Sequence, residues 1–589
     1  MAKDTTNDIN YLNASKTWAK AFGHALTQKD AKTAAALFLQ NGHWRDLIAF
    51  NWNIDTVSGP DAIAKKLSET LDDVQPTEFR IDDTRTPPRL VTRAGVESIE
   101  AFVTFKTKIG IANGVVRLLP DPNDSKTWRA WTFSTTLQEI TGHEERLSEV
   151  RVGGEAFKRE FGGDNWQDYR NKARSYEDRD PAVLVVGGGQ AGLGIAARLT
   201  HLGVDTLIVD RHTRIGDNWR KRYHSLTLHN EVYVNHMPYM PFPPTWPVYI
   251  PKDMLANWFE IYVEALELNY WTGTSLTNGT YDEAKKRWNV TLEQKDGSER
   301  IIYPRHIVMA TGVSAIPIMP DLPGLDKFKG KVMHSGQYTT GHEWSGGKAM
   351  VLGTGNSAHD VTQDLHACDV DVKMIQRSST HIVSLTEAQR VYALYAEGPP
   401  MDDCDLLATS FPFPVLKMGY RKATAMSKTI DKPLLDGLTA RGFKLNDGVD
   451  DCGFQMSYLQ RGGGYYFDVG CSKLIADGEI DVVHFEDIEC FNASGAVLKS
   501  GDSIQADLIV LATGYKNQQD TARVYLGDDV ADKIGPVWGF SNRGELQNMW
   551  QRTAQPGLWF TAGSLAQCRI FSKFLALQIK AEEVGLIET

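Results

Sequence analysis

The stretch that decides the fold is Ala182-Val183-Leu184-Val185-Val186-Gly187-Gly188-Gly189-Gln190-Ala191-Gly192. Its first five residues form a continuous apolar run, which predicts a strand buried on both faces of a parallel sheet. The following residues match G-x-G-x-x-G at Gly187, Gly189 and Gly192. In this pattern the first glycine permits a tight turn, the second lets the backbone approach a pyrophosphate, and the third lets helix and strand pack closely. The stretch therefore predicts a dinucleotide-binding βαβ unit.

The residues after this loop strengthen that prediction, because the glycine pattern alone is weak. We expect a helix over 195–202 and a second strand over 206–209, which ends at Asp210. An acid about 20 residues beyond the glycines is placed to hydrogen-bond a ribose hydroxyl, and it disfavours a 2′-phosphate. The first unit therefore suits FAD or NAD, with Gln190, Ala191 and Arg211 as further cofactor contacts. The alternative is a structural turn with a solvent-facing aspartate.

A second glycine loop follows much later, after the apolar run 349–352. It reads Gly353-Thr354-Gly355-Asn356-Ser357-Ala358 and gives G-x-G-x-x-A. The strand predicted over 370–375 leads to Arg377 and Ser378 rather than to an acid. A guanidinium offers a planar fork of donors suited to a phosphate. The loop therefore predicts an NADP(H) site, with Asn356, Ser357, Arg377 and Ser378 as candidate contacts; an exposed arginine at a strand end is the alternative.

Composition excludes several classes of protein. Of the 589 residues, 42% are hydrophobic and 10% aromatic, which is too rich for a disordered chain. The 63 Lys and Arg residues against 74 Asp and Glu residues give a net charge of −11, which argues against a general nucleic-acid binder. No secretory signal and no apolar run of roughly 18 residues is visible, so no membrane partner is expected.

The cysteines carry no chemistry that the sequence can identify. Six of them are scattered without a C-x-x-C pair, which disfavours the redox-active dithiol of a disulfide reductase. No clustered spacing of the kind found in zinc ribbons occurs, so no metal is expected. We expect free thiols in a reducing, cytoplasmic environment.

Five further segments resemble one family. They are Gly216-Asp217-Asn218-Trp219-Arg220; Ala310-Thr311-Gly312; the pattern F-x-G-x-x-x-H-x-x-x-Y at Phe328, Gly330, His334 and Tyr338; Ala512-Thr513-Gly514; and the C-terminal segment 567–579. Together with the two glycine loops they resemble the class B flavin-containing monooxygenases over residues 181–589. Tyr338-Thr339 and the segment 223–230 are more similar to flavin-containing monooxygenases proper and the plant auxin-forming enzymes than to type I Baeyer–Villiger enzymes. The long N-terminal extension is similar to that of the type II subset.

The resemblance implies an activity. NADPH would reduce FAD, and O2 would form a flavin C4a-hydroperoxide that inserts one oxygen atom into a small organic substrate. That substrate would be a sulfide or an amine, or a ketone in a Baeyer–Villiger oxidation, and members of the type II subset also use NADH. Exclusion of water protects such chemistry.

The resemblance also implies site residues. Asn230, His334 and Tyr338 are the catalytic candidates: Asn230 would lie beside the flavin, while His334 and Tyr338 would link domain motion to catalysis. A hinge histidine satisfied by hydrogen bonds is nearly the same reading of His334. The flavin contacts would include the following residues: Asn218, Trp219, Thr311, Gly312, Thr513, Gly514 and Gly563.

The predicted fold class is α/β, with two Rossmann-like domains for FAD and NADP preceded by an α+β domain. Residues 1–142, with helices over 18–26 and 34–39 and strands over 100–105 and 128–133, resemble an NTF2-like cone. A linker over 143–180, an FAD-binding part over 181–336, an NADP-binding domain over 337–490 and a C-terminal FAD-binding part over 491–589 follow. His43, Trp44, Arg45 and Asp46 could line a pocket in the first domain. We nevertheless expect that domain to be structural or an interface, including that of a homodimer.

Some alternatives stay open at this stage. The aromatic-rich insertion at about 385–467 could line a substrate cavity or form ordinary core. The activity could also be an NADPH oxidase that releases hydrogen peroxide. A third possibility is a redox-sensing flavoprotein that acts as a binding module.

Overall fold

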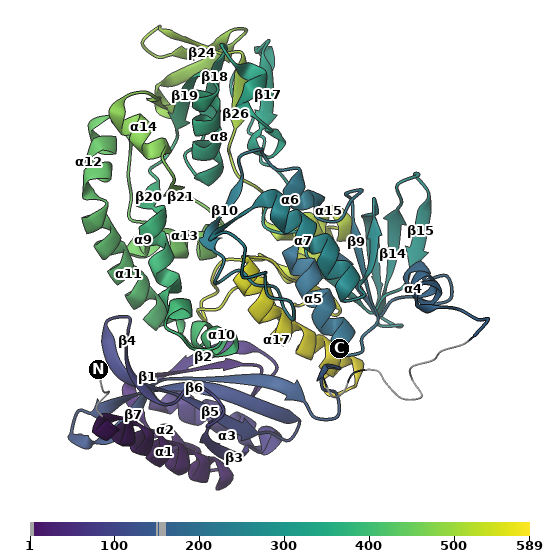
Figure 1. Cartoon of the computed structure of the whole chain (residues 1–589), viewed down its shortest axis with the longest axis vertical. Helices are drawn as coiled ribbons and strands as arrows, with labels where there is room; N and C mark the ends of the chain where they lie inside the picture. Colours follow the sequence, from purple (N-terminus) through teal and green to yellow (C-terminus); the bar gives the residue numbers. More distant parts are fainter. Residues whose placement is uncertain (1–4, 149–150, 152–160, 589) are drawn as a thin grey trace.

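The computed structural model of the chain describes residues 5–148, 151 and 161–588, so that 149–150 and 152–160 of the predicted linker lie outside the described residues. Within the described residues the fold is mixed α/β, with one seven-stranded sheet and two parallel five-stranded sheets (Figure 1). The described part of the predicted linker contains helix α4 (Trp166–Ser175). The seven-stranded sheet comes first in the chain, as the sequence predicts for an α+β unit.

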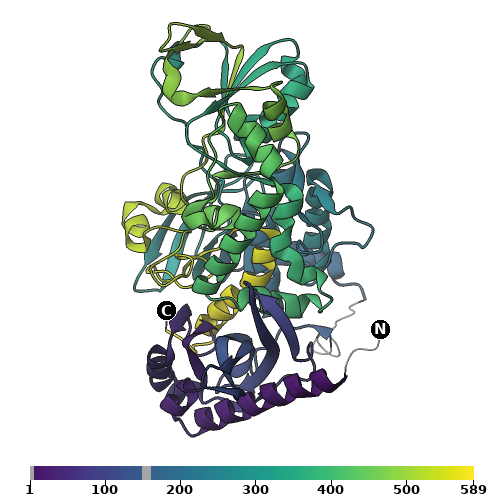
Figure 2. The same ribbon diagram turned by 90° about the vertical axis from the view of Figure 1, so that its left-hand side faces the viewer.

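The N-terminal domain, residues 5–140, is a curved sheet with helices on one side. Its elements are α1 (Thr5–Thr27), α2 (Ala31–Ala35), β1 (Phe38–Leu47), β2 (Ile54–Ser58), α3 (Pro60–Val74), β3 (Thr77–Ile81), β4 (Arg89–Arg93), β5 (Val96–Lys106), β6 (Gly110–Asp121) and β7 (Asp124–Ile140). The strand order is β2-β1-β7-β6-β5-β3, with β4 paired to β5. Trp18 and Phe22 of α1 stack on each other and pack edge-on against Phe133 of β7. Figure 2 shows α1 along the outer side of this domain.

The first parallel sheet carries the glycine loop from which the sequence analysis starts. Its order is β12-β9-β8-β16-β27, and the strands are β8 (Val183–Val186), β9 (Thr206–Asp210), β12 (Asn269–Thr272), β16 (His306–Met309) and β27 (Leu558–Phe560). All four residues of β8 are buried, as a parallel strand covered on both faces requires. Helices α5 (Gln190–His201), α7 (Lys252–Ala265) and α17 (Leu565–Glu583) and the antiparallel strands β13 (Ser275–Asp282), β14 (Arg287–Glu293) and β15 (Glu299–Ile302) complete this domain.

The second parallel sheet has the order β17-β26-β18-β19-β22. Its strands are β17 (Lys331–His334), β18 (Lys348–Leu352), β19 (Asp371–Gln376), β22 (Asp481–His484) and β26 (Leu508–Leu511), with α8 (Asn356–Ala367) and α14 (Cys471–Asp477) beside them. A small antiparallel sheet of β23 (Ile488–Asn492), β24 (Gly495–Leu498) and β25 (Ser503–Gln505) is attached.

The strand pairing departs from the expected domain boundaries at β17 and β26. β17 and β26 pair with each other in the second sheet, although the expected boundaries put residues 331–334 and 508–511 in the FAD-binding parts. The chain returns to the first sheet only at β27, which pairs with β16. The predicted helix over 34–39 also ends at Ala35, since Phe38 pairs with Ala130 in the sheet.

The insertion after β19 is helical. It consists of β20 (His381–Ser384), α9 (Leu385–Gln389), α10 (Met401–Thr409), α11 (Phe413–Ile430), α12 (Lys432–Ala440), α13 (Gly453–Arg461) and β21 (Tyr465–Asp468), with a 3-10 segment over 390–396. Its helix α10 reaches the N-terminal domain, where Phe102 and Val115 pack against Leu406 and Leu407. The insertion therefore bridges the N-terminal domain and the second parallel sheet.

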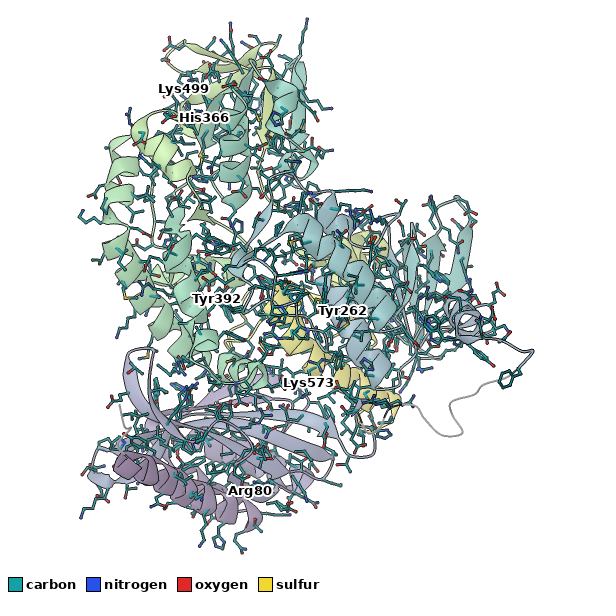
Figure 3. The ribbon with its side chains drawn as sticks, viewed as in Figure 1. Arg80, Tyr262, His366, Tyr392, Lys499 and Lys573 are labelled. Atoms are coloured by element: carbon teal, nitrogen blue, oxygen red, sulfur yellow. The ribbon has the colours of Figure 1, made fainter. Side chains whose placement is uncertain are left out.

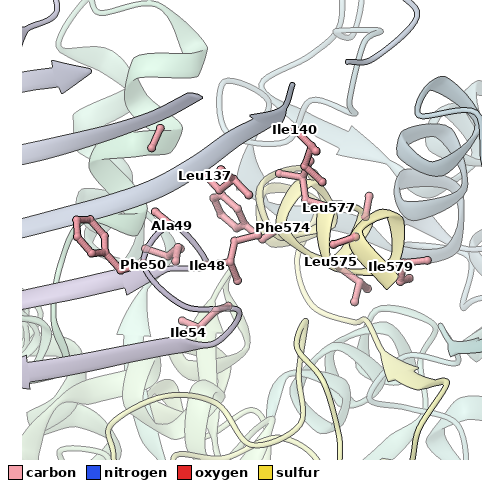
Figure 4. Close-up of a cluster of buried hydrophobic side chains, with 14 of the residues drawn as sticks. Ile48, Ala49, Phe50, Ile54, Leu137, Ile140, Phe574, Leu575, Leu577 and Ile579 are labelled. Carbon is pink, nitrogen blue, oxygen red and sulfur yellow. The ribbon is translucent and has the colours of Figure 1, made fainter. Parts of the chain in front are cut away.

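Helix α17 joins the N-terminal domain to the first parallel sheet. One side packs on α5, where Cys568 lies beside Gly194. The other side meets β7, so that Leu137 and Ile140 lie against Phe574 and Leu577 (Figure 4). Helix α17 is buried around most of its circumference. A helix of this kind needs neighbours on all sides, and α5 and β7 provide them from two domains.

A buried charge network lies on the face of the N-terminal sheet that meets the insertion. Glu100 and Arg117 are fully buried and form an ion pair at 2.8 Å, while Arg93 bridges Glu100 to Glu397 of the insertion. Burial raises the pKa of Glu100, but the neighbouring arginines more than offset it and hold that pKa at about 2. Removing one partner of such a pair leaves an uncompensated buried charge, so this network depends on the contact between the two domains.

Lys573 is partly buried in the seam between α17 and β7 (Figure 3). Its ammonium donates to Oε1 of Gln138 at 2.6 Å. Burial lowers the pKa of Lys573 to about 8 from an ordinary 10.5, with Arg198 and Arg85 adding to the effect and Glu145 and Asp402 opposing it. The surroundings in the seam therefore disfavour the protonated form of Lys573.

We expect Lys573→Met to change how stability depends on pH. Between pH 8 and 10.5 the unfolded chain binds a proton at this lysine that the folded chain lacks, so the lysine makes wild-type stability rise with pH, by about 3 kcal/mol in total. The variant lacks this rise. Urea unfolding of both proteins at pH 7.5 and pH 10 measures it, and Lys126→Met on an exposed hairpin is the control. A wild-type-minus-variant difference that is equal at both pH values would contradict the expectation.

Candidate active site

The first glycine loop has the geometry of a phosphate cradle. Gly187 has φ +109°, and a β-carbon there would lie 2.6 Å from the carbonyl oxygen of Ala310. Helix α5 begins directly after Gly189 at Gln190, rather than at Ile195 as predicted, and no side chain caps its first turn. A β-carbon at Gly192 would lie 1.9 Å from the carbonyl oxygen of Gly187, so helix and loop touch. The free backbone amides of this turn suit a pyrophosphate.

The acid after β9 is tied to the loop. Asp210 accepts from the backbone amide of Gly188 at 2.7 Å and from the backbone amide of His212 at 2.8 Å, while the His212 ring lies at hydrogen-bonding distance. Burial raises the pKa of Asp210, but these hydrogen bonds more than offset it and leave the pKa below its usual range. The carboxylate is therefore ionised, and it lines the cavity together with Arg211.

The second glycine loop repeats this geometry. Gly353 has φ +129°, with the Ala512 carbonyl oxygen 2.4 Å from the position of a β-carbon, and Gly355 precedes α8 without a side-chain cap. Ala358 is buried in the packing position. Asn356 and Ser357 line the cavity, and Asn356 accepts from the backbone amide of Phe467 at 2.9 Å.

A second group of sequence candidates lies beside the cavity rather than in its wall. The group comprises Gly192, Gly353, Gly355, Ala358, Arg377, Ser378, Thr513 and Gly514, none of which lines it. Arg377 and Ser378 are exposed beyond the end of β19. Their contact with a 2′-phosphate stays a prediction. Thr513 donates to the carbonyl of Ile318 at 2.6 Å and thereby fixes the segment that follows β26.

A chain of hydrogen bonds connects the first loop to the start of α17. The Trp219 indole donates to Oε1 of Gln190 at 3.1 Å, and Gln190 donates to the carbonyl of Gly563 at 3.2 Å. These residues line the cavity together with Asn218 and Gly312. Nearby, the buried hydroxyl of Thr311 has no hydrogen-bond partner among the described residues. A polar atom left open in this way fits a bound polar ligand.

His334 and Tyr338 do not line the cavity, and their role in linking domain motion to catalysis stays a prediction. Nδ1 of His334 accepts from the Gly336 amide at 3.1 Å, so Nε2 carries the proton and donates to the Gly514 carbonyl at 3.1 Å. Burial lowers the pKa of His334. Tyr338 donates to Asp364 at 2.5 Å. The hydrogen-bonding groups of both side chains have partners inside the second domain, where they position the loop that carries Gly336.

Asn230 does line the cavity. It belongs to β10 (Thr227–Glu231), and its carbonyl accepts from the Asn235 amide group at 2.8 Å. Burial raises the pKa of Tyr392 to about 12, and a hydrogen bond with Asn230 partly offsets this rise. Tyr392 comes from the insertion, so the insertion contributes to the site and is not ordinary core alone.

One cavity of about 1430 Å³ contains all of these lining groups. Its wall includes residues of the first glycine loop, Asn356 and Ser357 of the second loop, and an aromatic region with Tyr392, Phe411, Phe413, Tyr420 and Phe540. Sequence reasoning missed two sources of its wall: Glu545 in the C-terminal segment, and Ile54 and residues 92–95 in the N-terminal domain. Of the four residues proposed for a pocket in that domain, 43–46, only Arg45 lines it. No local pattern marked Glu545 or Arg93, since their partners Arg45 and Glu397 lie hundreds of positions away in the sequence.

The fold and the cavity define a flavoprotein oxidoreductase with two nucleotide sites. A family profile described as "Pyridine nucleotide-disulphide oxidoreductase" matches residues 184–391. Indole-3-pyruvate monooxygenase YUCCA1 of Oryza sativa subsp. japonica is 34% identical over 349 residues, which are 57% of this chain and 77% of that protein. Probable indole-3-pyruvate monooxygenase YUCCA4 of Arabidopsis thaliana is 30% identical over 345 residues, 57% of this chain and 76% of that protein.

A similar fold occurs in a crystal structure of cyclohexanone monooxygenase with bound epsilon-caprolactone. The TM-score is 0.51 and the identity 17%, over 69% of this chain and 88% of that one. The sequence matches show that the chain belongs to the flavin-dependent monooxygenase family that contains the YUCCA enzymes. It is an enzyme of this type, and its cofactors are FAD and NADPH.

The cysteines fit this family better than a dithiol reductase. Within the described residues all six are free, and five of them are buried. The described residues also contain no group of His, Cys, Asp and Glu side chains that could hold a metal ion. None of the described helices combines the length and the apolar character needed to cross a membrane.

We expect Gly192→Ala to loosen the first loop. Its β-carbon would have to push α5 away from Gly187, so the free energy of unfolding should fall by about 1–3 kcal/mol and FAD should bind more weakly. Urea unfolding and release of the yellow chromophore measure both effects.

The matched control is Gly194→Ala in the same helix. Its β-carbon would meet its nearest neighbour at 3.5 Å, which is an ordinary contact. Because alanine is the better helix former, stability should be unchanged or higher by about 0.5–1 kcal/mol. Equal losses in the two variants would show that the close approach at Gly192 is not the cause.

Proposed function

We propose that the chain binds FAD on the loop 187–192 and NADPH on the loop 353–358, and oxygenates an apolar small organic substrate in the aromatic region. The observation that carries this proposal is the single cavity, which joins both glycine loops to an aromatic chamber. Both loops have uncapped helix starts and glycine geometry that leaves room for phosphates.

The protein's own residues would bind, orient and shield. Bound FAD would supply the oxygen-activating chemistry and NADPH the electrons. Gln190, Trp219 and Gly563 would hold the floor beneath the flavin through their hydrogen-bond chain. Asn230, supported by Tyr392, would orient groups at the flavin edge. The aromatic side chains would exclude water from the reacting atoms.

The substrate class follows from the chamber. Its walls are rich in phenyl and phenol rings and aliphatic side chains, so they favour an apolar molecule with a sulfide, amine or ketone group. The names of the relatives include an aromatic keto acid, indole-3-pyruvate, and a cyclic ketone, cyclohexanone. Carbonyl compounds therefore belong among the first candidates, which would include Baeyer–Villiger oxidation.

The test is a product assay under oxygen-18. Purified protein with NADPH is given thioanisole, N,N-dimethylbenzylamine or cyclohexanone, and mass spectrometry measures labelled product. We expect at least one product that contains one labelled oxygen atom. Stoichiometric hydrogen peroxide with every compound would instead identify an oxidase. Failure of NADPH to reduce the bound flavin would leave only a redox-sensing binding module.

The position of the NADPH 2′-phosphate can be tested at Arg377. We expect Arg377→Ala to raise KM for NADPH roughly ten- to hundredfold and to leave KM for NADH nearly unchanged, because only NADPH carries the phosphate that this guanidinium would bond. The control is Lys373→Ala, which removes one partner of a surface ion pair on β19. Equal changes for both nucleotides would remove Arg377 from the site.

A further inference from the structure

The cavity has a wall that comes from outside both nucleotide-binding sheets. Arg45 of β1, Ile54 of β2 and residues 92–95, which form the end of β4 and its turn into β5 (called the turn 92–95), all line it. Residues of helix α11 and of the start of α17 also line the cavity. The N-terminal domain therefore takes part in the cavity itself, beyond packing against its outside.

Arg45 ties three walls of the cavity together. Its guanidinium donates to both carboxylate oxygens of Glu545, at 2.9 and 2.6 Å, and to the carbonyl of Thr409 at 2.7 Å. Both side chains of the pair are about nine-tenths buried. One side chain of the N-terminal domain thus fixes the end of α10 and the C-terminal segment. A two-pronged geometry of this kind sets position as well as energy.

The N-terminal sheet also supports the aromatic walls from behind. Alternate residues of β5 face opposite sides, so that Ile99, Ala101 and Val103 join the core with α1–α3 while Phe102 packs on α10. Val415, which lines the cavity, packs on Leu39 and Trp131 of the sheet. The Arg117 guanidinium lies 4.1 Å from the centre of the Phe411 ring.

The cavity reaches the surface between the turn 92–95 and α11. Thr92 and Gly95 are exposed lining residues on one side, and Lys422 and Met426 are exposed lining residues on the other. The two sides are close: a β-carbon on Gly419 would lie 3.6 Å from Cβ of Ala94. Among the other exposed lining residues, Arg211 and Lys221 belong to the proposed cofactor region, and Arg390, Ala393 and Glu397 belong to the insertion.

We propose that the N-terminal domain is a structural wall of the substrate chamber and that its turn 92–95, with α11, forms the entrance that selects apolar substrates by size. This inference rests on the proposed function, because it assigns the aromatic end of the cavity to the substrate. The glycine loops and residues 92–95 are separate parts of the cavity wall. Obstruction of the entrance should therefore affect the substrate and leave reduction of the flavin by NADPH unaffected.

The experiment places a bulky group at the entrance of the full-length holoenzyme. In a Cys490→Ser background the remaining native cysteines are buried, so Thr92→Cys gives one accessible thiol for pyrene maleimide. We expect kcat/KM for thioanisole and for the larger dibenzyl sulfide to fall about tenfold or more after labelling, the larger sulfide more strongly. The rate of flavin reduction by NADPH should stay within about twofold. Met426→Cys, on the facing side, should give the same result.

The matched control is Lys126→Cys, which carries the same label on a hairpin of the same domain outside the cavity. If labelled Thr92→Cys and labelled Met426→Cys enzymes keep the kinetics of this control with both sulfides, the entrance lies elsewhere and the proposal fails.

A binding assay separates failure of the entrance from failure of the proposed function. If no compound is oxygenated while NADPH still reduces the flavin, fluorescence of 1-anilinonaphthalene-8-sulfonate replaces turnover as the measure of access. Slower or weaker dye uptake by labelled Thr92→Cys than by the labelled control supports the entrance even then. Equal uptake overturns it.

Discussion

The burial of α17 is the constraint on which the rest of the structure depends. Its buried residues, among them Cys568, Phe574, Leu577 and Ile579, lie around most of its circumference, so no single sheet can cover it. The first parallel sheet covers one side through α5, and β7 of the N-terminal domain covers the other. The N-terminal domain is thereby held in a fixed place, although it belongs to neither nucleotide-binding sheet.

The polar contacts between the N-terminal domain and the insertion explain why the arrangement is specific. The Glu100–Arg117 pair is fully buried, and buried ions are tolerated only where their partners stay in place. Arg93 links that pair to Glu397, and Arg85 pairs with Asp403 of α10. Sliding of the insertion over the sheet would break several charge-assisted contacts at once. The apolar seam supplies the burial energy, and the ionic contacts set the register.

Local features could be predicted from the sequence, whereas long-range contacts could not. The two glycine loops were predictable because turn geometry and helix starts depend on a few adjacent residues. The start of α5 was misplaced because glycines at 192 and 194 resemble a continued loop. The pairing of β17 with β26 joins strands far apart in sequence, and an apolar run does not indicate which strand it will pair with. His334 was recognised in its motif, but only its two hydrogen bonds reveal that it positions a loop.

The same distinction applies to the candidate site. Arg45 and Glu545 are 500 residues apart, and neither lies in a recognisable motif. Oxygen chemistry on a flavin requires a chamber that excludes water, and such a chamber needs walls on every side. Arg45, Ile54 and residues 92–95 of the N-terminal domain line one side of the cavity from outside the two parallel sheets. An added domain whose sheet packs behind Phe411 and Val415 closes that side. In the proposed function, the N-terminal extension therefore serves as a wall of the substrate chamber.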